Sequence, residues 1–413
     1  MTVMDAPRTA TAPARSAMAG AIVAQLSQAV GSFLLQVLAA RILGREGLAQ
    51  FALLYGLVIV GTAASTGLVG DALTVLDRHA APVRAGLQWW AARVVLVAAS
   101  AMAAAVLAIG ELDAMDAVWF ALATGTFLLE DLVRRLLMAS MRFWSIVVVD
   151  LVVLVGSLGV VAVVHLGPGT VTLRTFLVAM VVGQCAAGAV AWTMLPAADR
   201  RWVRGVTPDR AIVWRYGSWR ALQHGIRPVA LAVVRVVSIA VIGLAAYGEV
   251  EAARLFVAPA ILAVNGASNY LFASFATSSS ASTPELLRRA DRGVAALLAA
   301  AVALGAAAVA ALPLLGDVVS AGAFGISPLA VAGWSTFAAA TAAITPYGVL
   351  AAVRVPQAKV FVIRVVETLV SIGVVWTVLA SGAEGWTIPV VLGACSALAG
   401  WAIRASIVAE ESP

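Results

Sequence analysis

Long apolar runs, each about as long as a bilayer core is thick, dominate the 413-residue sequence. A helix needs about 20 mostly apolar residues to cross a membrane. About twelve such runs occur, joined by connections too short to hold a soluble domain. They cover residues 17–43, 49–71, 87–110, 114–137, 143–165, 172–195, 216–243, 250–273, 293–316, 327–350, 359–380 and 386–407. Because helices satisfy their own backbone hydrogen bonds in lipid, the pattern predicts an all-α polytopic membrane protein.

The composition supports this prediction and excludes other classes of protein. The chain is 62% hydrophobic and 12% charged, whereas a soluble domain is about 45–50% apolar and about 25% charged. The net charge of +6 would suit a nucleic-acid-binding protein, but the basic residues are scattered between the apolar runs, so we expect no nucleic-acid partner. Both cysteines, Cys185 and Cys395, lie inside apolar runs and predict neither a disulfide nor a metal site.

The placement of arginine predicts the orientation in the membrane. The first apolar run follows a short polar arm, residues 1–16, and lacks a small-residue cleavage site, so we interpret it as a retained helix. With that arm in the cytoplasm, the cytoplasmic connections hold most loop arginines, and the outer ones hold Arg45, Arg174 and Arg254. Basic residues favour the cytoplasmic side, so both termini are predicted to be cytoplasmic.

The two halves of the chain, residues 1–205 and 206–413, resemble each other as the products of a duplication would. Similar polar and small residues recur at corresponding places in the two halves. The matched pairs are Gln25 with Gln223, Asp150 with Glu367, Gly156 with Gly373, and Cys185 with Cys395. Two halves with the same orientation form a parallel repeat about an axis along the membrane normal. We therefore predict two six-helix bundles around a central cavity.

The run at residues 216–243 carries the most polar face of the predicted spans. Arg220, Gln223 and Arg227 follow helical spacing on one face, and Arg235 lies two turns further on. An arginine deep in an apolar helix costs about 2.5–3.5 kcal/mol on insertion scales. This face therefore indicates a water-filled cavity or an anionic ligand. The alternative is that Arg220 and Arg227 extend toward the membrane interface.

Polar side chains recur in two other predicted spans. They are Gln25 and Gln28 in the first span, with Arg41 near its outer end, and Asn265 and Asn269 in the eighth. One interpretation is a hydrophilic wall that binds sugar hydroxyls. The other is hydrogen bonding between helices, which such residues also provide in membranes.

Asp150 and Glu367 are the acids that lie clearly inside predicted spans, away from their ends. They are candidates for ion or proton coupling, because buried acids mark such pathways. Alternatively, a nearby arginine neutralises each of them, for example Arg142 for Asp150 and Arg364 for Glu367. Two further pairs with helical i, i+4 spacing are expected to be structural: Glu130 with Arg134, and Asp131 with Arg135.

The residues present in the sequence argue against an enzyme. His79, His165 and His224 form no metal-binding pair, and the sequence holds no phosphate-binding loop of the ATPase type. We therefore expect neither a metal site nor a cofactor.

Several motifs resemble those of a known family. They are Gln25–Gln28, Leu38–Gly44 and Gly47–Phe51 at the start of the chain, Gly67–Asp71, Asp131–Ser140 followed by Asp150, and Tyr216–Trp219 with Tyr247–Glu249 at the start of the second half. Together they are similar to bacterial polysaccharide flippases of the multidrug/oligosaccharidyl-lipid/polysaccharide exporter superfamily. The resemblance extends over most of the chain.

The resemblance implies a function and a site. Members of this family move undecaprenyl-pyrophosphate-linked oligosaccharides across the bacterial cytoplasmic membrane by alternating access between two bundles. Cationic cavity residues are expected to meet the pyrophosphate, which here implies Arg227 and Arg235, with Arg41 as a further candidate. The implied partners are the lipid-linked glycan, membrane lipids, and a glycan polymerase or other assembly proteins.

Two other functions are compatible with a polytopic helical protein. A multidrug antiporter of the same superfamily would carry organic cations and should have an acidic cavity, whereas the predicted cavity is basic. A non-transporting scaffold of a glycan-assembly complex would tolerate the loss of Arg227 and Arg235.

Overall fold

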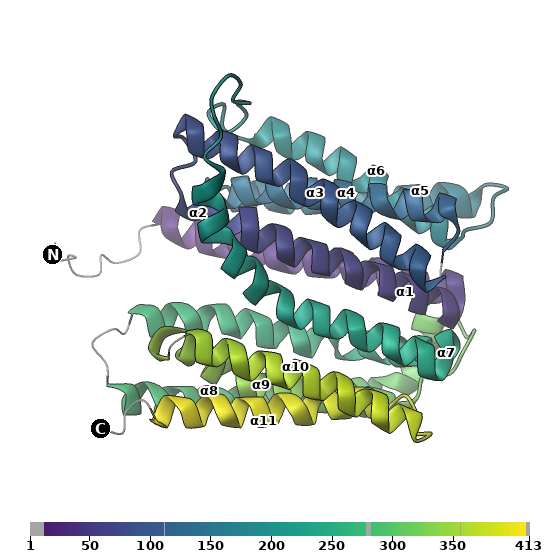
Figure 1. Ribbon diagram of the computed structural model, residues 1–413. Coiled ribbons are helices and arrows are strands. Elements are labelled where there is room, and N and C mark those ends of the chain that lie inside the picture. Colours follow the sequence, from purple (N-terminus) through teal and green to yellow (C-terminus); the bar gives the residue numbers. More distant parts are fainter. Residues whose placement is uncertain (1–11, 111, 278–281, 356, 410–413) are drawn as a thin grey trace. The chain divides into compact units, whose positions relative to one another are not determined.

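The computed structural model describes residues 12–110, 112–277, 282–355 and 357–409. Within these ranges the chain is helical and has no strand (Figure 1). The helices are α1 (Ala12–Ser65), α2 (Asp71–Val75), α3 (Ala81–Ile109), α4 (Ala114–Ala139), α5 (Phe143–Leu166), α6 (Leu173–Met194), α7 (Arg210–Thr277), α8 (Thr283–Ser320), α9 (Pro328–Arg354), α10 (Gln357–Ala380) and α11 (Thr387–Ala409). A π-helical turn, η1 (Thr66–Gly70), joins α1 to α2.

Two of these helices are each long enough for two spans. Among the described residues, 9 helices are long and apolar enough to cross a membrane. Helices α1 and α7 contain 54 and 68 residues, about 80 and 100 Å at 1.5 Å per residue, against a hydrocarbon core of about 30 Å. Helix α4 is not among these 9, because its acidic residues and arginines lower its hydropathy, but it coincides with the predicted span at 114–137. With α1 and α7 divided in two, the helices confirm the predicted spans.

Glycines divide α1 and α7. Gly44 has φ 69° and Gly243 has φ 82°, the positive-φ region that glycine adopts without steric cost. The breaks fall where the predicted spans 17–43 and 216–243 end. The backbone stays helical at Pro228.

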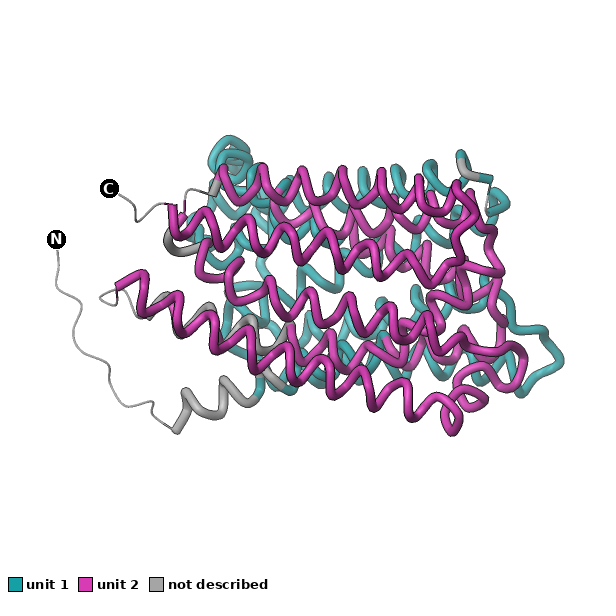
Figure 2. Tube along the Cα trace, turned by 90° about the horizontal axis from the view of Figure 1, so that it is seen from below, with its two compact units in different colours: residues 1–32, 61–222 teal, residues 33–60, 223–413 magenta. Residues whose placement is uncertain are grey.

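The chain forms two compact units (Figure 2). Unit 1 comprises Met1–Ser32 and Gly61–Leu222, and unit 2 comprises Phe33–Val60 and Gln223–Pro413. The chain therefore passes between units inside α1 and α7. The division into halves 1–205 and 206–413 stays a prediction from the repeat.

Each unit has its own apolar core. In unit 1, α6 packs against α4 and α5, and α3 packs against α4. Leu128 and Leu137 of α4 and Ile146 of α5 are fully buried there. In unit 2, α9 packs against α8 and α11, and α10 packs against α11. The apolar side chains of these helices pack against one another in the core of each unit.

Candidate functional site

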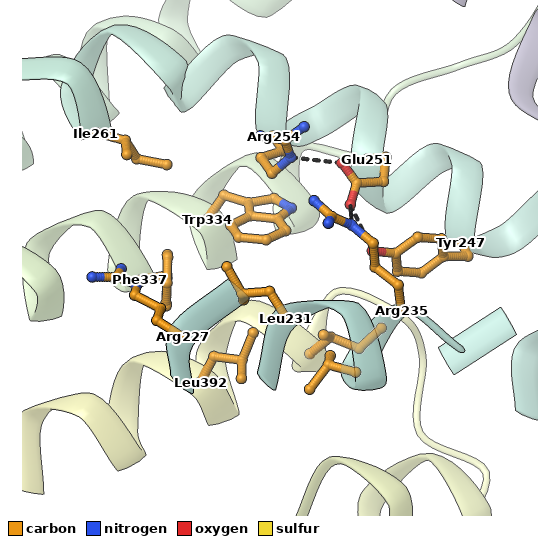
Figure 3. Close-up of a pocket in the computed structure, with 12 residues that line it drawn as sticks. Arg227, Leu231, Arg235, Tyr247, Glu251, Arg254, Ile261, Trp334, Phe337 and Leu392 are labelled. Carbon is orange, nitrogen blue, oxygen red and sulfur yellow. Dashed lines mark hydrogen bonds and ion pairs between the residues drawn. The ribbon is translucent and has the colours of Figure 1, made fainter. Parts of the chain in front are cut away.

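Unit 2 contains a cavity of about 290 Å³ lined by α7, α9 and α11. Its wall combines apolar and charged side chains (Figure 3). The lining residues are Arg227, Leu231, Val234, Arg235, Tyr247, Glu251, Arg254 and Ile261 of α7, Trp334 and Phe337 of α9, and Ile388 and Leu392 of α11. The two arginines predicted from the seventh span therefore line one cavity.

The kink in α7 assembles the charged part of this wall. On the arm after Gly243, Tyr247, Glu251 and Arg254 are spaced i, i+4 and i+7 and so share one helical face. The kink brings this face against the arm before it, where Arg235 reaches Glu251. Side chains far apart on a straight helix therefore meet.

Glu251 is the centre of a hydrogen-bonded charge network (Figure 3). Its side chain is only 1% exposed. It accepts hydrogen bonds from Arg235 Nε at 3.1 Å, Arg254 Nε at 2.6 Å and Tyr247 Oη at 2.6 Å. These bonds satisfy a carboxylate whose burial would otherwise be costly. One carboxylate faces two guanidinium groups, so the network carries an excess positive charge.

Helix α1 completes the network from both of its arms. Gln36 on the first arm accepts a hydrogen bond from Arg254 Nη2. Gly56 on the second arm lies against Arg235, and a Cβ atom at that position would collide with the guanidinium group. Glycine at position 56 therefore provides the space that the Arg235 side chain occupies.

Arg227 differs from the other two arginines of this cavity. Its Nη2 donates a hydrogen bond to Thr341 Oγ1 at 3.2 Å, and its guanidinium lies 5.5 Å from the centre of the Phe337 ring. Within the described part of the chain, no carboxylate lies within ion-pair distance of it. In Figure 3 it lies apart from the Glu251 network, on the other side of Trp334. Its charge is therefore available to an anion in the cavity.

A second cavity of about 210 Å³ shares Arg227 with the first. Gln223, Arg364 and Glu367 also line it. Glu367 accepts hydrogen bonds from Arg364 Nη1 at 2.9 Å and from Ser396 Oγ at 2.7 Å. The predicted pairing of Glu367 with Arg364 is confirmed, and its role in ion coupling stays a prediction.

Asp150 belongs to a different cluster, in the core of unit 1. Arg134 Nε lies 3.2 Å from Asp150 Oδ1, and Ser27 Oγ donates a hydrogen bond to Oδ2 at 2.5 Å. Neutralisation by an arginine is confirmed, but the expected partner, Arg142, is wrong. Arg142 instead donates to the carbonyl of Met194 at 2.6 Å, where the carboxyl end of α6 attracts a cation.

Of the two predicted i, i+4 ion pairs on α4, one is confirmed and one is wrong. Arg135 pairs with Asp131 at 2.7 Å, as predicted. The predicted pair of Glu130 with Arg134 is wrong, because Arg134 forms its ion pair with Asp150. Oε1 of Glu130 is buried with no hydrogen-bond partner in the described structure. Tertiary packing thus overrides the local spacing.

The remaining predicted site residues lie elsewhere. Arg41 donates to the carbonyl of Val318 at 2.8 Å and lines neither cavity of unit 2. Gln25 is exposed and Gln28 half-buried, both in unit 1. The side chains of Asn265 and Asn269 lie outside the described residues. Arg220 pairs with Asp71 at 2.7 Å inside unit 1.

Glu251, the acid at the centre of the site, was not among the residues predicted from the sequence. Glu251, together with Arg254 and Gln36, forms the network around Arg235. The spacing of Tyr247, Glu251 and Arg254 is a signal that could have found it, because it places a carboxylate and a cation on one helical face. Gln36 carries no comparable local signal.

Comparison with known proteins identifies the fold. No family model and no curated protein match the sequence. Among solved structures, an inward-facing multidrug resistance MATE family transporter of the MOP superfamily superimposes with a TM-score of 0.68 at 15% identity, covering 94% of this chain and 99% of that chain. An outward-facing MATE structure gives a TM-score of 0.63 at 14% identity, covering 97% of each chain.

A third neighbour is a MOP superfamily transporter from Pyrococcus furiosus, for which a reverse polarity of the binding pocket is described as suggesting a different function. Its TM-score is 0.60 at 14% identity, and 98% of each chain is covered. Identities this low show the fold alone. The chain shares the fold of these transporters, which confirms the predicted all-α fold.

Proposed function

We propose that this chain is an alternating-access transporter that moves undecaprenyl-pyrophosphate-linked oligosaccharide across the bacterial cytoplasmic membrane. One observation carries the proposal: the unit 2 cavity presents Arg227, Arg235 and Arg254 against the single carboxylate of Glu251. An excess of cations inside an apolar bundle is costly without a compensating anion. A substrate that brings its own negative charge removes that cost.

A pyrophosphate suits these arginines chemically. Guanidinium groups form short, charge-assisted hydrogen bonds with phosphate oxygens, often two at a time. Both Arg235 and Arg254 bond Glu251 through Nε, and Arg254 Nη2 also bonds Gln36. This leaves the Nη groups of Arg235 and Nη1 of Arg254 for other acceptors. Arg227 supplies a cation with no carboxylate partner in the described structure. The pyrophosphate would bind among these groups while the prenyl tail stays in lipid.

The resemblance of the motifs to polysaccharide flippases supports the same substrate class. Gln223, which lines the second cavity beside Arg227, is suited to hydrogen-bonding sugar hydroxyls. The membrane lipids and a glycan polymerase or other assembly proteins are the expected partners. The arginine asymmetry favours cytoplasmic termini.

A second candidate function is multidrug export, which the fold of the two MATE neighbours favours. Organic cations would need an excess of acids in the cavity. Here the charge balance has the opposite sign, with three arginines and one glutamate. An exporter with this cavity would therefore carry organic anions in preference to organic cations.

The test measures which leaflet holds the lipid-linked glycan in cells that depend on this protein. Depletion should trap the glycan in the inner leaflet, and Arg227→Ala should fail to restore export at a normal protein level. Arg288→Ala is the matched control, because Arg288 is exposed on α8 and lines neither cavity. Wild-type export by Arg227→Ala would remove this residue from the mechanism. Normal surface glycan with new sensitivity to drugs would favour the second function.

A further inference from the structure

Unit 1 holds a cavity of about 200 Å³ that the proposed function does not use. It is a groove lined mainly by α3 and α4, with contributions from η1, α2, the end of α6 and the segment that follows α6. Most of its wall is apolar, with Leu73, Leu87, Leu132 and Leu136 among the lining residues. Arg78 and Arg84 also contribute to the wall, beside Asp199. The groove thus has a mostly apolar wall and a basic end.

The groove is open on the outer surface of the helices. Leu129, Trp192 and Trp202 line it and are 51%, 43% and 62% exposed. In a membrane, the apolar part of this surface would face lipid. From Leu129 to Leu136 the wall of α4 rises about 10 Å at 1.5 Å per residue. That length accommodates part of one acyl chain.

The basic end has an uncompensated charge. Arg78 Nε lies 3.2 Å from Asp199 Oδ1. The Nη1 and Nη2 groups of Arg84 donate to the carbonyls of Ala198 and Asp199, both at 2.6 Å. Since a carbonyl carries no net charge, two guanidinium groups share the single carboxylate of Asp199. The end of the groove therefore attracts an anion.

Aromatic residues indicate that this end lies at the membrane–water interface. Trp89 and Trp90 on α3 follow closely after Arg84, and Arg93 and Arg210 lie 3.4 and 4.5 Å from the centre of the Trp89 ring. Tryptophan gathers at the level of lipid headgroups, and arginine side chains extend toward the same level. Lipid phosphates lie at the same level, within reach of the basic end.

We propose that this groove binds an anionic phospholipid, with the upper part of one acyl chain along the leucines of α3 and α4 and the headgroup phosphate at Arg78 and Arg84. The acyl chain gains little free energy by moving from the bilayer into the groove, because lipid tails are as apolar as leucine. Selectivity must therefore come from the headgroup. One basic residue near an anionic lipid changes the affinity roughly fivefold.

The test uses the full-length protein in vesicles with brominated lipids, which quench nearby tryptophan fluorescence. Brominated phosphatidylglycerol in unlabelled phosphatidylcholine is compared with the reverse mixture at equal mole fractions. The Trp192 signal is isolated as the difference from Trp192→Phe. We expect a relative association constant about fivefold higher for phosphatidylglycerol. Equal quenching by the two lipids would overturn the proposal.

A matched pair of variants locates the binding site. Ala92→Phe fills the groove without changing its charge, whereas Ala104→Phe adds the same ring to an exposed position of α3 outside the groove. The preference should disappear in Ala92→Phe and persist in Ala104→Phe. A preference that persists in Ala92→Phe would contradict binding in the groove. Because this assay measures no transport, its outcome is independent of the proposed function.

A charge variant tests the headgroup contact. Arg78→Gln should lower the preference roughly fivefold, and Arg78→Lys should retain it. An unchanged preference in Arg78→Gln would exclude Arg78 as a headgroup contact.

Discussion

The two units each bury a carboxylate among arginines, but they do so in different ways. In unit 1, Asp150 and Arg134 form a one-to-one pair, and the two residues are 8% and 4% exposed. In unit 2, Glu251 holds two arginines, Arg235 and Arg254, whose side chains are 14% and 21% exposed beside the cavity. In the first cluster, Asp150 and Arg134 balance each other one to one and are enclosed in packing. The second keeps an excess charge that a ligand can reach.

This difference indicates how to separate structural from functional charges in a membrane bundle. A balanced, enclosed pair contributes to holding its helices together, and its loss should affect folding. A cationic excess at a cavity surface contributes little to folding and should affect transport. The number of arginines per acid and the access to a cavity distinguish the two, whereas the residue types alone do not.

The largest expected effect is the loss of stability in Arg134→Ala. This change leaves Asp150 charged, buried and without its arginine. Breaking one side of a buried pair costs about 3–5 kcal/mol, so the protein should unfold at a much lower temperature in detergent. Arg134→Lys, which keeps the charge, should recover part of the loss. Thermal unfolding close to that of the wild type would contradict a structural role for the pair.

Glu251→Gln should have a smaller effect on folding and a large one on transport. The amide still accepts a hydrogen bond, and Arg235 and Arg254 border a cavity that water can enter. We expect a loss of about 2–3 kcal/mol in the free energy of unfolding and a loss of glycan export. Glu249→Gln is the control, because its pair with Arg45 is exposed. The comparison of the two units would fail if Glu251→Gln destabilised the protein as much as Arg134→Ala.

Two serine variants give a finer comparison. Ser27 donates to the buried carboxylate of Asp150, and Ser396 donates to Glu367 at the second cavity. Loss of an internal hydrogen bond costs about 0.5–1.5 kcal/mol. The loss in free energy of unfolding should lie near the upper value for Ser27→Ala. For Ser396→Ala it should lie near the lower value, because water can replace the hydroxyl at a cavity. Equal shifts in the unfolding temperature would mean that cavity access does not matter.

Arg227→Ala should have the smallest effect on stability. The side chain has one neutral hydrogen-bond partner, Thr341, and no carboxylate partner among the described residues. Its removal should change the free energy of unfolding by less than about 0.5 kcal/mol, while export is lost. A large loss of stability would show that Arg227 is a structural residue like Arg134.

Local features of the sequence predict the helices well. The apolar runs mark the spans because their length must match the bilayer, and Gly44 and Gly243 mark the breaks because only glycine takes their backbone angles at no cost. The pair of Glu367 with Arg364 is also local, since the residues lie three apart on one helix. Such features depend on the residues within one or two turns.

The partners of Asp150 and Arg235 could not be predicted in this way. Sequence spacing favoured Arg142 for Asp150, but the arginine that reaches it, Arg134, comes from a different helix. For Arg235, the kink at Gly243 brings Glu251 into contact from the other arm of α7. Both contacts depend on how helices meet in space.

By itself, the sequence determined that this chain is a polytopic helical membrane protein with arginines inside one span, because apolar length and helical periodicity are local properties. Only the tertiary structure decided which of those charges are neutralised. Arg235 is held by Glu251, Arg41 binds a backbone carbonyl away from the cavity, and Arg227 keeps an uncompensated charge. Charge compensation requires contact within about 4 Å, and in a folded chain such distances are set by packing and not by separation along the sequence.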